Sequence, residues 1–288
     1  MELVTVIIPT HNRVSLVQKA IASALNQTWK NIEILVINDA STDDTGTELK
    51  KLQNNNNSIR VIKNNISMGG AEARNQGIKN ANGKFIAFLD DDDTWEPTKI
   101  SKQMFLLESN PDCSVVSCWY YFRSSIPFIK QVYKPKNIFD ERPILNKNSL
   151  GGASNYLIKK QYLDDIGGFD PSLKGGQDWD LLIRLFYKGP LLVYEEPLVN
   201  YFAHAGTRIT TNTHSIYSGR RQMYFKYLKK MDVQTKDYFL AELLFRRMKI
   251  ESRLRWFNFF RMRQIFRLVN FSDAFIYILR YIKWLLKI

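Results

Sequence analysis

Hydrophobic positions follow two different periods along the first 110 residues of the chain. Continuous apolar runs rich in β-branched residues predict buried strands at residues 3–9, 32–38, 59–63 and 84–89. Apolar residues at helical spacing predict one helix at residues 14–25 and another at 70–80. Between them, Ser41 or Thr42 offers an N-cap for a further helix. This alternation is typical of an α/β fold in which helices cover both faces of a mostly parallel central sheet.

Polar clusters follow three of these predicted strands. They are Thr-His-Asn-Arg at 10–13, Asn-Asp-Ala-Ser at 38–41, and four consecutive aspartates at 90–93. Ligands of parallel sheets bind outside the carboxyl ends of the strands, so we expect these clusters to line a binding site. The sequence contains neither G-x-x-x-x-G-K-[ST] nor a G-x-G-x-x-G after the first strand, which argues against P-loop, kinase and dinucleotide-binding proteins.

The four aspartates indicate the chemistry of that site. Adjacent carboxylates repel one another, so a divalent cation or a positive ligand is expected to neutralise them. In an extended segment Asp90 and Asp92 would share one face, while Asp91 and Asp93 would point elsewhere. Oxygen ligands suit Mg²⁺ or Mn²⁺, which keep positions open for phosphate oxygens. A solvated acidic loop is the alternative interpretation.

Three classes of protein remain compatible with this pattern. Asp90-x-Asp92-x-Thr94 fits the strand-end motif of aspartyl-phosphate phosphatases, in which the first aspartate attacks phosphorus. That nucleophile normally follows the first strand of its domain, whereas three strand–helix units precede Asp90. In glycosyl transfer from a nucleotide sugar, a metal held by the carboxylates neutralises the leaving diphosphate. The third class is a non-catalytic nucleotide-sugar binder at a membrane.

Six segments resemble, in order, the motifs of the family 2 glycosyltransferases with the GT-A fold. They are residues 4–12, 36–43, 73–78, 88–93, 167–170 and 177–181, and the ordered set is specific although no single motif is. The resemblance covers roughly residues 3 to 210. It implies a Rossmann-like catalytic domain at 1–213, with a nucleotide-sugar half at 1–110 and an acceptor half at 111–213.

The resemblance also implies a UDP-sugar donor and roles for individual residues. The nucleotide-sugar site would comprise Pro9, Thr10, His11, Arg13, Asp39, Arg74, Asp90, Asp91 and Arg208. Asp39 would accept a hydrogen bond from uracil, although it could instead cap a helix. Arg74 would approach the base or the diphosphate, the alternative being a solvated helix surface. Mn²⁺ or Mg²⁺ would be held by Asp92 and Asp90, with His204 as a further candidate that could also be purely structural.

Asp178 is the expected general base. It shares the inward face of a predicted helix with Leu181, Leu182 and Leu185, and an acid on such a face must meet a metal, a cation or a substrate. In an inverting transfer, one carboxylate removes the proton of the attacking acceptor hydroxyl. The family usually has Glu before this Asp, whereas this chain has Gln177, which would still hydrogen-bond an acceptor.

Other residues near Asp178 have less specific expectations. Trp179 could stack on an acceptor sugar or belong to the core. Asp180 and Arg184 are spaced for an ion pair on a helix surface. Residues 120–148 are rich in Lys, Pro and aromatic residues and are expected to form a loop or hairpin on the acceptor side.

The net charge of +13 is concentrated at the C-terminal end, where residues 246–288 hold eleven Lys or Arg and two acids. Within a helix predicted from Phe271 to Ile288, three basic residues at 280, 283 and 287 share one stripe. A helix with such a stripe is expected to lie in the plane of an anionic membrane surface rather than to span the membrane. A dimerisation or core helix pair is the alternative, and no recognised nucleic-acid module is present.

The sequence therefore predicts a GT-A catalytic domain followed by a basic, aromatic, helical extension at 214–288 that associates with a membrane. Two cysteines and no signal peptide indicate a cytoplasmic protein, peripheral on the inner face of the cell membrane. The expected reaction moves a hexose or N-acetylhexosamine from a UDP-sugar to a hydroxyl of a glycan. That acceptor is expected to be a lipid-linked intermediate of O-antigen, capsule or another surface polysaccharide.

Overall fold

The computed structural model describes residues 1–123, 130–202 and 213–250 of the chain. Two compact units can be distinguished. Unit 1 comprises residues 1–144, 148–171 and 177–205, and unit 2 comprises 145–147, 172–176 and 206–288. The predicted division of the catalytic domain into two halves at residue 110 stays a prediction.

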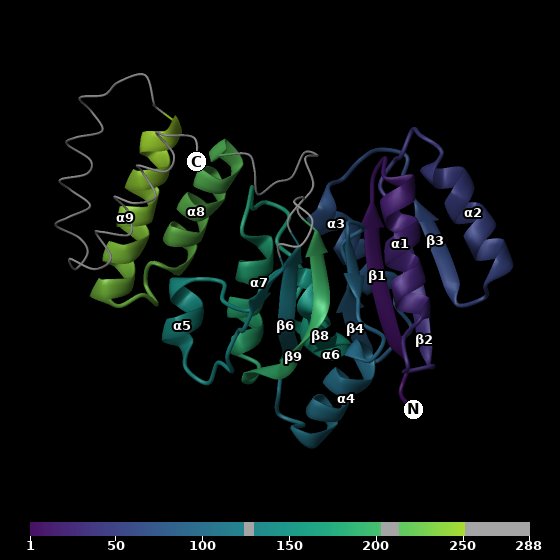
Figure 1. Cartoon of the computed structure of the whole chain (residues 1–288). Coiled ribbons are helices and arrows are strands. Elements are labelled where there is room, and N and C mark those ends of the chain that lie inside the picture. The colour runs from purple at the N-terminus through teal and green to yellow at the C-terminus, as the bar shows by residue number, and fades with distance from the viewer. Residues whose placement is uncertain (124–129, 203–212, 251–288) are drawn as a thin grey trace. The chain divides into compact units, whose positions relative to one another are not determined.

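The first part of unit 1 alternates strands and helices, as predicted (Figure 1). Its elements are β1 (Val4–Thr10), α1 (Val14–Leu25), β2 (Ile32–Asn38), α2 (Thr45–Asn55), β3 (Ile59–Lys63), α3 (Gly70–Asn80) and β4 (Phe85–Phe88). The helix α2 begins later than predicted, because Ser41 and Thr42 do not cap it. They bind Asn12 instead, through its backbone N–H and its side-chain oxygen respectively.

The following elements are shorter and less regular. They are β5 (Asp93–Trp95), α4 (Lys99–Ser109), β6 (Val115–Arg123), β7 (Lys130–Tyr133), α5 (Glu141–Asn146), the 3₁₀ turn η1 (Ala153–Asn155), β8 (Leu157–Lys159), α6 (Lys160–Ile166), α7 (Gln177–Phe186) and β9 (Leu191–Phe202). The β6–β7 pair is antiparallel, so the hairpin expected between residues 120 and 148 is present.

The nine strands in the described part of the chain join one sheet in the order β3-β2-β1-β4-β8-β6-β9-β5, with β7 at the side of β6. The strands β1 to β4 are parallel to one another. Beyond β4 the strand β8 is antiparallel to both neighbours, and β5 is antiparallel to β9. The prediction of a mostly parallel sheet is thus correct for β1–β4 and wrong for the rest, where the sheet is mixed.

Helices cover both faces of the parallel part. Val6 and Ile8 of β1 share a buried cluster with residues of α1 such as Val17 and Ile21. Ile7 points to the opposite face, where a Cβ on Gly77 of α3 would lie 2.4 Å from its side chain. This close packing holds α3 against the sheet and places Arg74 of the same helix near the carboxyl end of β4.

The described part of unit 2 consists mainly of two long helices, α8 (Thr213–Tyr227) and α9 (Val233–Ile250), which agrees with the helical pattern predicted beyond residue 214. They pack on each other, and Arg220 of α8 lies 3.5 Å from Glu242 of α9. Among the described helices, none has the length and apolar character required to cross a bilayer. The predicted helix at 271–288 and its basic stripe lie outside the described residues.

Candidate active site

The four aspartates form a turn directly after β4. The N–H of Asp93 donates to the carbonyl oxygen of Asp90 at 3.0 Å, which closes a turn across the run. As a result, Asp90, Asp92 and Asp93 each offer a carboxylate oxygen within 4.8 Å of the others. The expectation that Asp93 points away from Asp90 and Asp92 is wrong, because side chains alternate only in an extended segment. We call these three residues the acidic cluster.

Two arginines of the same unit neutralise the aspartates. Arg13, at the start of α1, lies 2.8 Å from Asp91 and 3.4 Å from Asp92. Arg74 of α3 forms an ion pair with Asp90. Burial raises the pKa of Asp91, against the opposing effects of Arg13 and of the Thr10 hydroxyl, which donates to it at 2.8 Å. The repulsion within the run is therefore reduced by cations that the fold itself supplies.

Arg74 lies in the interior of the site rather than on a solvated helix surface. Its side chain is 12% exposed, one Nη donates to the Gly70 carbonyl at 3.1 Å, and its guanidinium lies 5.5 Å from the centroid of the Phe169 ring. Burial opposes its charge, yet Asp90 and Asp178 raise its pKa above the ordinary value. Its Nε is buried and has no hydrogen-bond partner among the residues that the structure describes, so one donor remains for a ligand.

Two of the motifs singled out in the sequence contact each other beside Arg74. Asn75 donates to the Phe169 carbonyl at 2.9 Å and accepts from the Phe169 N–H at 2.7 Å. The left-handed backbone at Gly168, with φ of +67°, leaves no room for a Cβ, which would lie 2.4 Å from Asn75. This reciprocal pair joins α3 to the segment that follows α6.

Asp39 holds the loop that leads into α3. Its carboxylate accepts hydrogen bonds from Asn64 at 2.9 Å, Ser67 at 2.8 Å, and the N–H groups of Met68 and Gly69 at 2.9 Å each. Burial opposes ionisation, but these donors lower the pKa of Asp39. Asp39 is thus an organiser of this loop rather than a helix cap, and its contact with uracil stays a prediction.

The residues after β1 and β2 lie next to each other. His11 Nδ1 is 2.6 Å from the Asp39 carbonyl. Asn12 and Ala40 both have left-handed backbones, with φ of 53° and 60°. Such conformations are uncommon outside glycine and concentrate at functional sites. The predicted nucleotide-binding segment from Pro9 to Arg13 therefore meets the Asp39 loop at one end of the sheet.

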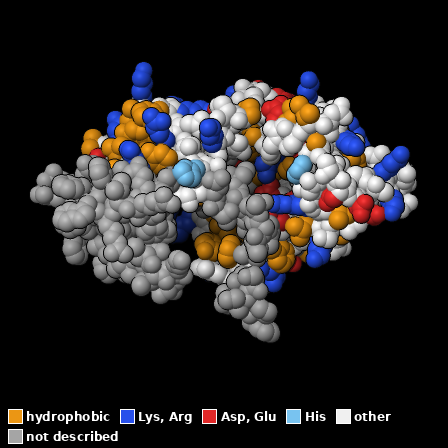
Figure 2. Space-filling model, turned by 90° about the horizontal axis from the view of Figure 1, so that it is seen from above, with side chains coloured by type: hydrophobic (Ala, Val, Ile, Leu, Met, Phe, Trp, Pro, Cys, Tyr) orange, Lys and Arg blue, Asp and Glu red, His pale blue; other side chains and the backbone are white. Residues whose placement is uncertain are grey.

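Asp178 reaches the same site from α7. It receives a hydrogen bond from the Ala153 N–H, and burial raises its pKa to about 6, although Arg74 opposes the rise and Asp90 adds to it. The position of Gly152 also places Asp178 in this site, because a Cβ there would lie 3.6 Å from Asp178 Oδ2, and Ser154, two residues further on, bonds to Asp90 and Asp93. The structure thus brings together two acidic segments that are distant in the chain. Figure 2 views this end of β1, where acidic and basic side chains lie next to one another.

The neighbours of Asp178 differ in part from the predictions. Trp179 is 2% exposed and its Nε1 donates to the Ile144 carbonyl, which supports the core alternative. Asp180 pairs with Arg184 at 2.8 Å as predicted, but the pair is not on the surface, because Asp180 is fully buried. Gln177 begins α7 and is partly exposed. His204 and Arg208 lie outside the described residues, so their roles stay predictions.

The sequence did not indicate that the backbone at Gly151 and Gly152 lies beside Asp178. The N–H of Gly152 donates to the hydroxyl of Tyr201 at 2.9 Å. A Cβ on Gly152 would lie 2.9 Å from that hydroxyl and 3.6 Å from Asp178 Oδ2. Gly151 has φ of +87° and would bring a Cβ within 2.2 Å of Asn155. A Gly-Gly pair before a short strand is a sequence signal that could have indicated this close approach of the backbone to Tyr201 and Asp178.

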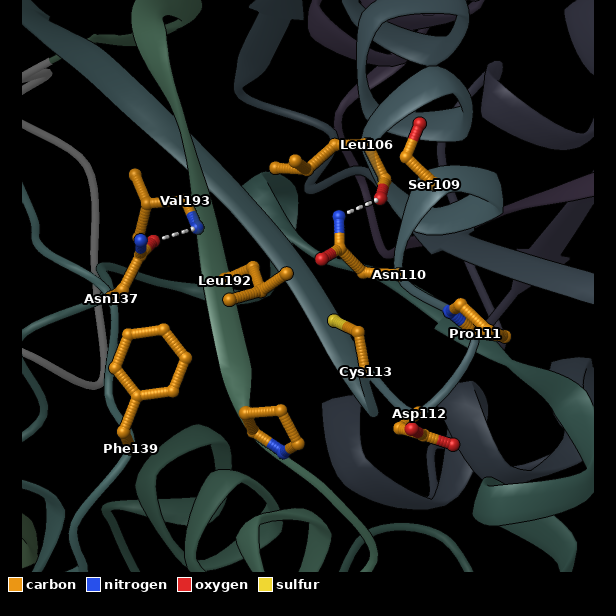
Figure 3. A pocket seen from close by; sticks show the side chains of 11 residues that line it. Leu106, Ser109, Asn110, Pro111, Asp112, Cys113, Asn137, Phe139, Leu192 and Val193 are labelled. Carbon is orange, nitrogen blue, oxygen red and sulfur yellow. Dashed lines mark hydrogen bonds between the residues drawn. The ribbon is translucent and has the colours of Figure 1, made fainter.

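A pocket of about 520 Å³ opens elsewhere in unit 1 (Figure 3). Its wall combines apolar side chains such as Leu106 and Phe139 with Asn110 and Asn137. No member of the acidic cluster lines it, and Asp178 is also absent from its lining. The pocket is therefore distinct from the candidate active site.

An acidic cluster at the carboxyl end of a parallel strand, with arginines and a separate carboxylate facing it, is typical of group-transfer enzymes of the α/β class. The chain belongs to glycosyl transferase family 2, whose family model matches residues 5–167. It is therefore a glycosyltransferase.

Relatives and solved structures agree with this assignment. The UDP-Glc:alpha-D-GlcNAc-diphosphoundecaprenol beta-1,3-glucosyltransferase WfaP of Escherichia coli is 34% identical over 211 residues, which cover 72% of this chain and 80% of WfaP. An uncharacterized glycosyltransferase of Haemophilus influenzae is 30% identical over 234 residues, or 78% of each chain. The structure of S. aureus TarS 1–349 with UDP-GlcNAc superposes with a TM-score of 0.69 at 18% identity, covering 94% of this chain and 82% of that one. The last similarity concerns the fold alone.

Proposed function

We propose that this glycosyltransferase is an inverting, metal-dependent enzyme that moves a hexose or N-acetylhexosamine from a UDP-sugar to a hydroxyl of a glycan. The observation that carries the proposal is that residues 152–154 lie against both the acidic cluster and Asp178, while Arg74 pairs with Asp90 and interacts electrostatically with Asp178. One group of carboxylates would serve the departing nucleotide, and the other would serve the incoming hydroxyl.

The acidic cluster fits a divalent cation. Asp90, Asp92 and Asp93 offer three carboxylate oxygens at close range, and such donors suit Mg²⁺ or Mn²⁺. The ion supplies positive charge that stabilises the leaving diphosphate. Asp93 joins the two ligands predicted from the sequence, and His204 stays a further candidate.

Arg13 and Arg74 are suited to bind the diphosphate of the donor. Their guanidinium groups now face the aspartates, where they compensate negative charge. A guanidinium presents several N–H donors in a geometry that matches phosphate oxygens. The unpartnered Nε of Arg74 provides one such donor without breaking an existing bond.

Asp178 is suited to be the general base. With its pKa at about 6 it is mostly ionised at neutral pH, yet it is a stronger base than an ordinary aspartate. It would take the proton of the acceptor hydroxyl as the hydroxyl oxygen bonds to the anomeric carbon. The bond from that carbon to the diphosphate breaks on the opposite side, and no glycosyl-enzyme intermediate forms.

The proposed acceptor is a lipid-linked glycan of a bacterial surface polysaccharide. WfaP, a relative at 34% identity, is named as a glucosyltransferase with a diphosphoundecaprenol-linked acceptor. Residues 246–288 carry eleven basic residues and many aromatic residues, which suits attachment to an anionic membrane surface from the cytoplasmic side. No nucleic-acid partner is proposed.

Incubation with UDP-glucose or UDP-GlcNAc and Mn²⁺ tests the proposal. We expect slow release of UDP without free phosphate, faster when the correct acceptor is added. Phosphate released from a monoester would instead support the phosphatase class. Binding of the nucleotide sugar without any turnover would support a non-catalytic binder.

The membrane proposal has its own test. Replacing Arg280, Lys283 and Lys287 together by Gln should weaken binding to anionic vesicles by about 10²-fold, since each basic residue near such a surface contributes about 1 kcal/mol. The matched control replaces three exposed lysines of unit 1, namely Lys50, Lys63 and Lys79, and should bind as the wild type does. Equal loss in both triple variants would indicate a general charge effect instead of an anchor.

A further inference from the structure

One short turn contacts both groups of carboxylates. Ser154 is the middle residue of η1, and its hydroxyl accepts from the Asp90 N–H at 3.0 Å while it donates to Asp93 Oδ2 at 2.7 Å. The residue before it, Ala153, donates its N–H to Asp178. Consecutive residues of η1 therefore bind the acidic cluster and the proposed base.

The turn is held firmly from its other side. The Ser154 carbonyl accepts from Trp95 Nε1 at 2.9 Å. The Asn155 carbonyl accepts from Gln103 Nε2 at 2.7 Å, and the same amide group donates to the Val116 carbonyl at 2.9 Å. Ser154 and Asn155 are both fully buried. The hydroxyl of Ser154 is thus fixed by packing and by hydrogen bonds to neighbouring elements.

Asp93 depends on donors of this kind. It is 2% exposed, and a buried carboxylate needs hydrogen bonds to compensate for lost water. The Ser154 hydroxyl meets this need and at the same time fixes the backbone of Asp90. A single atom, Oγ, therefore orients two of the three members of the acidic cluster.

We propose that Ser154 is a positioning residue that orients Asp90 and Asp93 for a divalent cation and ties them to the turn that holds Asp178. The proposal rests on the metal assignment made under the proposed function. Groups that orient metal ligands through hydrogen bonds typically affect metal affinity by about 10–100-fold. Ser154 lies in the segment before β8, whereas Asp90 and Asp93 follow β4. A residue from the mixed part of the sheet would thus orient metal ligands that follow the parallel part.

The test is Mn²⁺ binding, measured by calorimetry in the presence of UDP. Ser154→Ala should weaken Mn²⁺ binding by about 10–100-fold relative to the wild type. The matched control is Ser117→Ala, which also removes a fully buried hydroxyl. That hydroxyl donates to the Leu150 carbonyl at 3.0 Å instead of to an aspartate. Ser117→Ala should bind Mn²⁺ as the wild type does.

Two further measurements separate positioning from general damage to the fold. The kcat of Ser154→Ala should return to within a few-fold of wild type at saturating Mn²⁺, because only the occupancy of the site is reduced. Ser154→Thr keeps the hydroxyl and should bind Mn²⁺ more tightly than Ser154→Ala. Recovery of kcat and rescue by Thr would not occur if Ser154 only supported packing.

The possible results separate the role of Ser154 from the metal assignment. Equal Mn²⁺ affinity in the wild type and Ser154→Ala would overturn the role of Ser154 and leave the proposed function intact. Equal weakening in Ser117→Ala would overturn it too, because any buried hydroxyl would then have the same effect. A wild-type protein that binds no Mn²⁺ would contradict the metal assignment itself, and the role of Ser154 would be rejected with it.

Discussion

The acidic cluster and Asp178 place the same residue type in two different environments within a single unit. The aspartates after β4 face Arg13, Arg74 and the hydroxyl of Ser154. Asp178 also interacts with Arg74, but burial is the larger effect there and raises its pKa to about 6. Carboxylates paired with cations are suited to hold charge, whereas a desolvated carboxylate is suited to exchange a proton. We therefore expect the environment, more than the residue type, to decide the role of each carboxylate.

The sharpest test of this contrast removes the charge of the proposed base. Asp178→Asn should lower the rate of transfer by about 10²-fold or more, since an amide cannot accept the proton. UDP-sugar affinity should stay within a few-fold of wild type, because Asp178 is not part of the acidic cluster. Steady-state kinetics and a donor-binding assay measure the two effects, and near-normal turnover would place the base elsewhere.

The converse change removes a member of the acidic cluster. Asp92→Ala should abolish the dependence of UDP binding on Mn²⁺. Loss of a group that only orients a metal ligand weakens metal affinity by about 10–100-fold, and loss of a ligand should weaken it at least as much. Calorimetry with and without Mn²⁺ measures it. Asp164→Ala, which removes an exposed carboxylate paired with Lys160, is the control and should leave that dependence unchanged. Unchanged Mn²⁺ dependence in Asp92→Ala would refute the metal assignment.

The pH dependence of transfer should report on Asp178. A base must be ionised to accept a proton, so kcat/KM should rise with pH through about 6 and fall roughly tenfold between pH 7 and pH 5. The residual activity of Asp178→Asn should lack this limb. A rate that stays flat from pH 5 to pH 7 in the wild type would assign the proton transfer to another group.

The smallest expected effect concerns stability. The pKa of Asp178 is raised by folding, so its protonated form favours the folded state at low pH, and this stability is lost as pH rises through about 6. Asp178→Asn should therefore be more stable than wild type by about 1–2 kcal/mol at pH 8 and nearly equal at pH 4. Thermal unfolding at the two pH values measures this, and a destabilised variant at pH 8 would contradict the burial argument.

The sequence predicted the parallel part of the sheet well. Its strands are continuous apolar runs and its helices have clear apolar stripes, so local pattern and final structure agree for β1 to β4. The antiparallel β8 contains three residues, too few to show any period, and for this reason the mixed character of the sheet was missed. The order of the motifs, through the family resemblance, was sufficient to predict that Asp178 and the acidic cluster lie in the same site.

The errors within the site have a common cause. Whether Asp93 shares a face with Asp90 depends on a turn that apolar patterning does not encode. The i to i+4 spacing predicted the pair of Asp180 with Arg184, but burial is a property of the tertiary structure. The contacts of Ser154 and Tyr201 join distant segments, so neither residue carries a local signal.

The glycine at position 152 has a consequence for the range of acceptors. A methyl group there would press against the Tyr201 hydroxyl and stand 3.6 Å from Asp178 Oδ2. We expect the hydrogen atom in its place to leave the proposed base open to a bulky alcohol. Larger residues at this position are then expected to slow transfer to bulky acceptors more than transfer to slim ones.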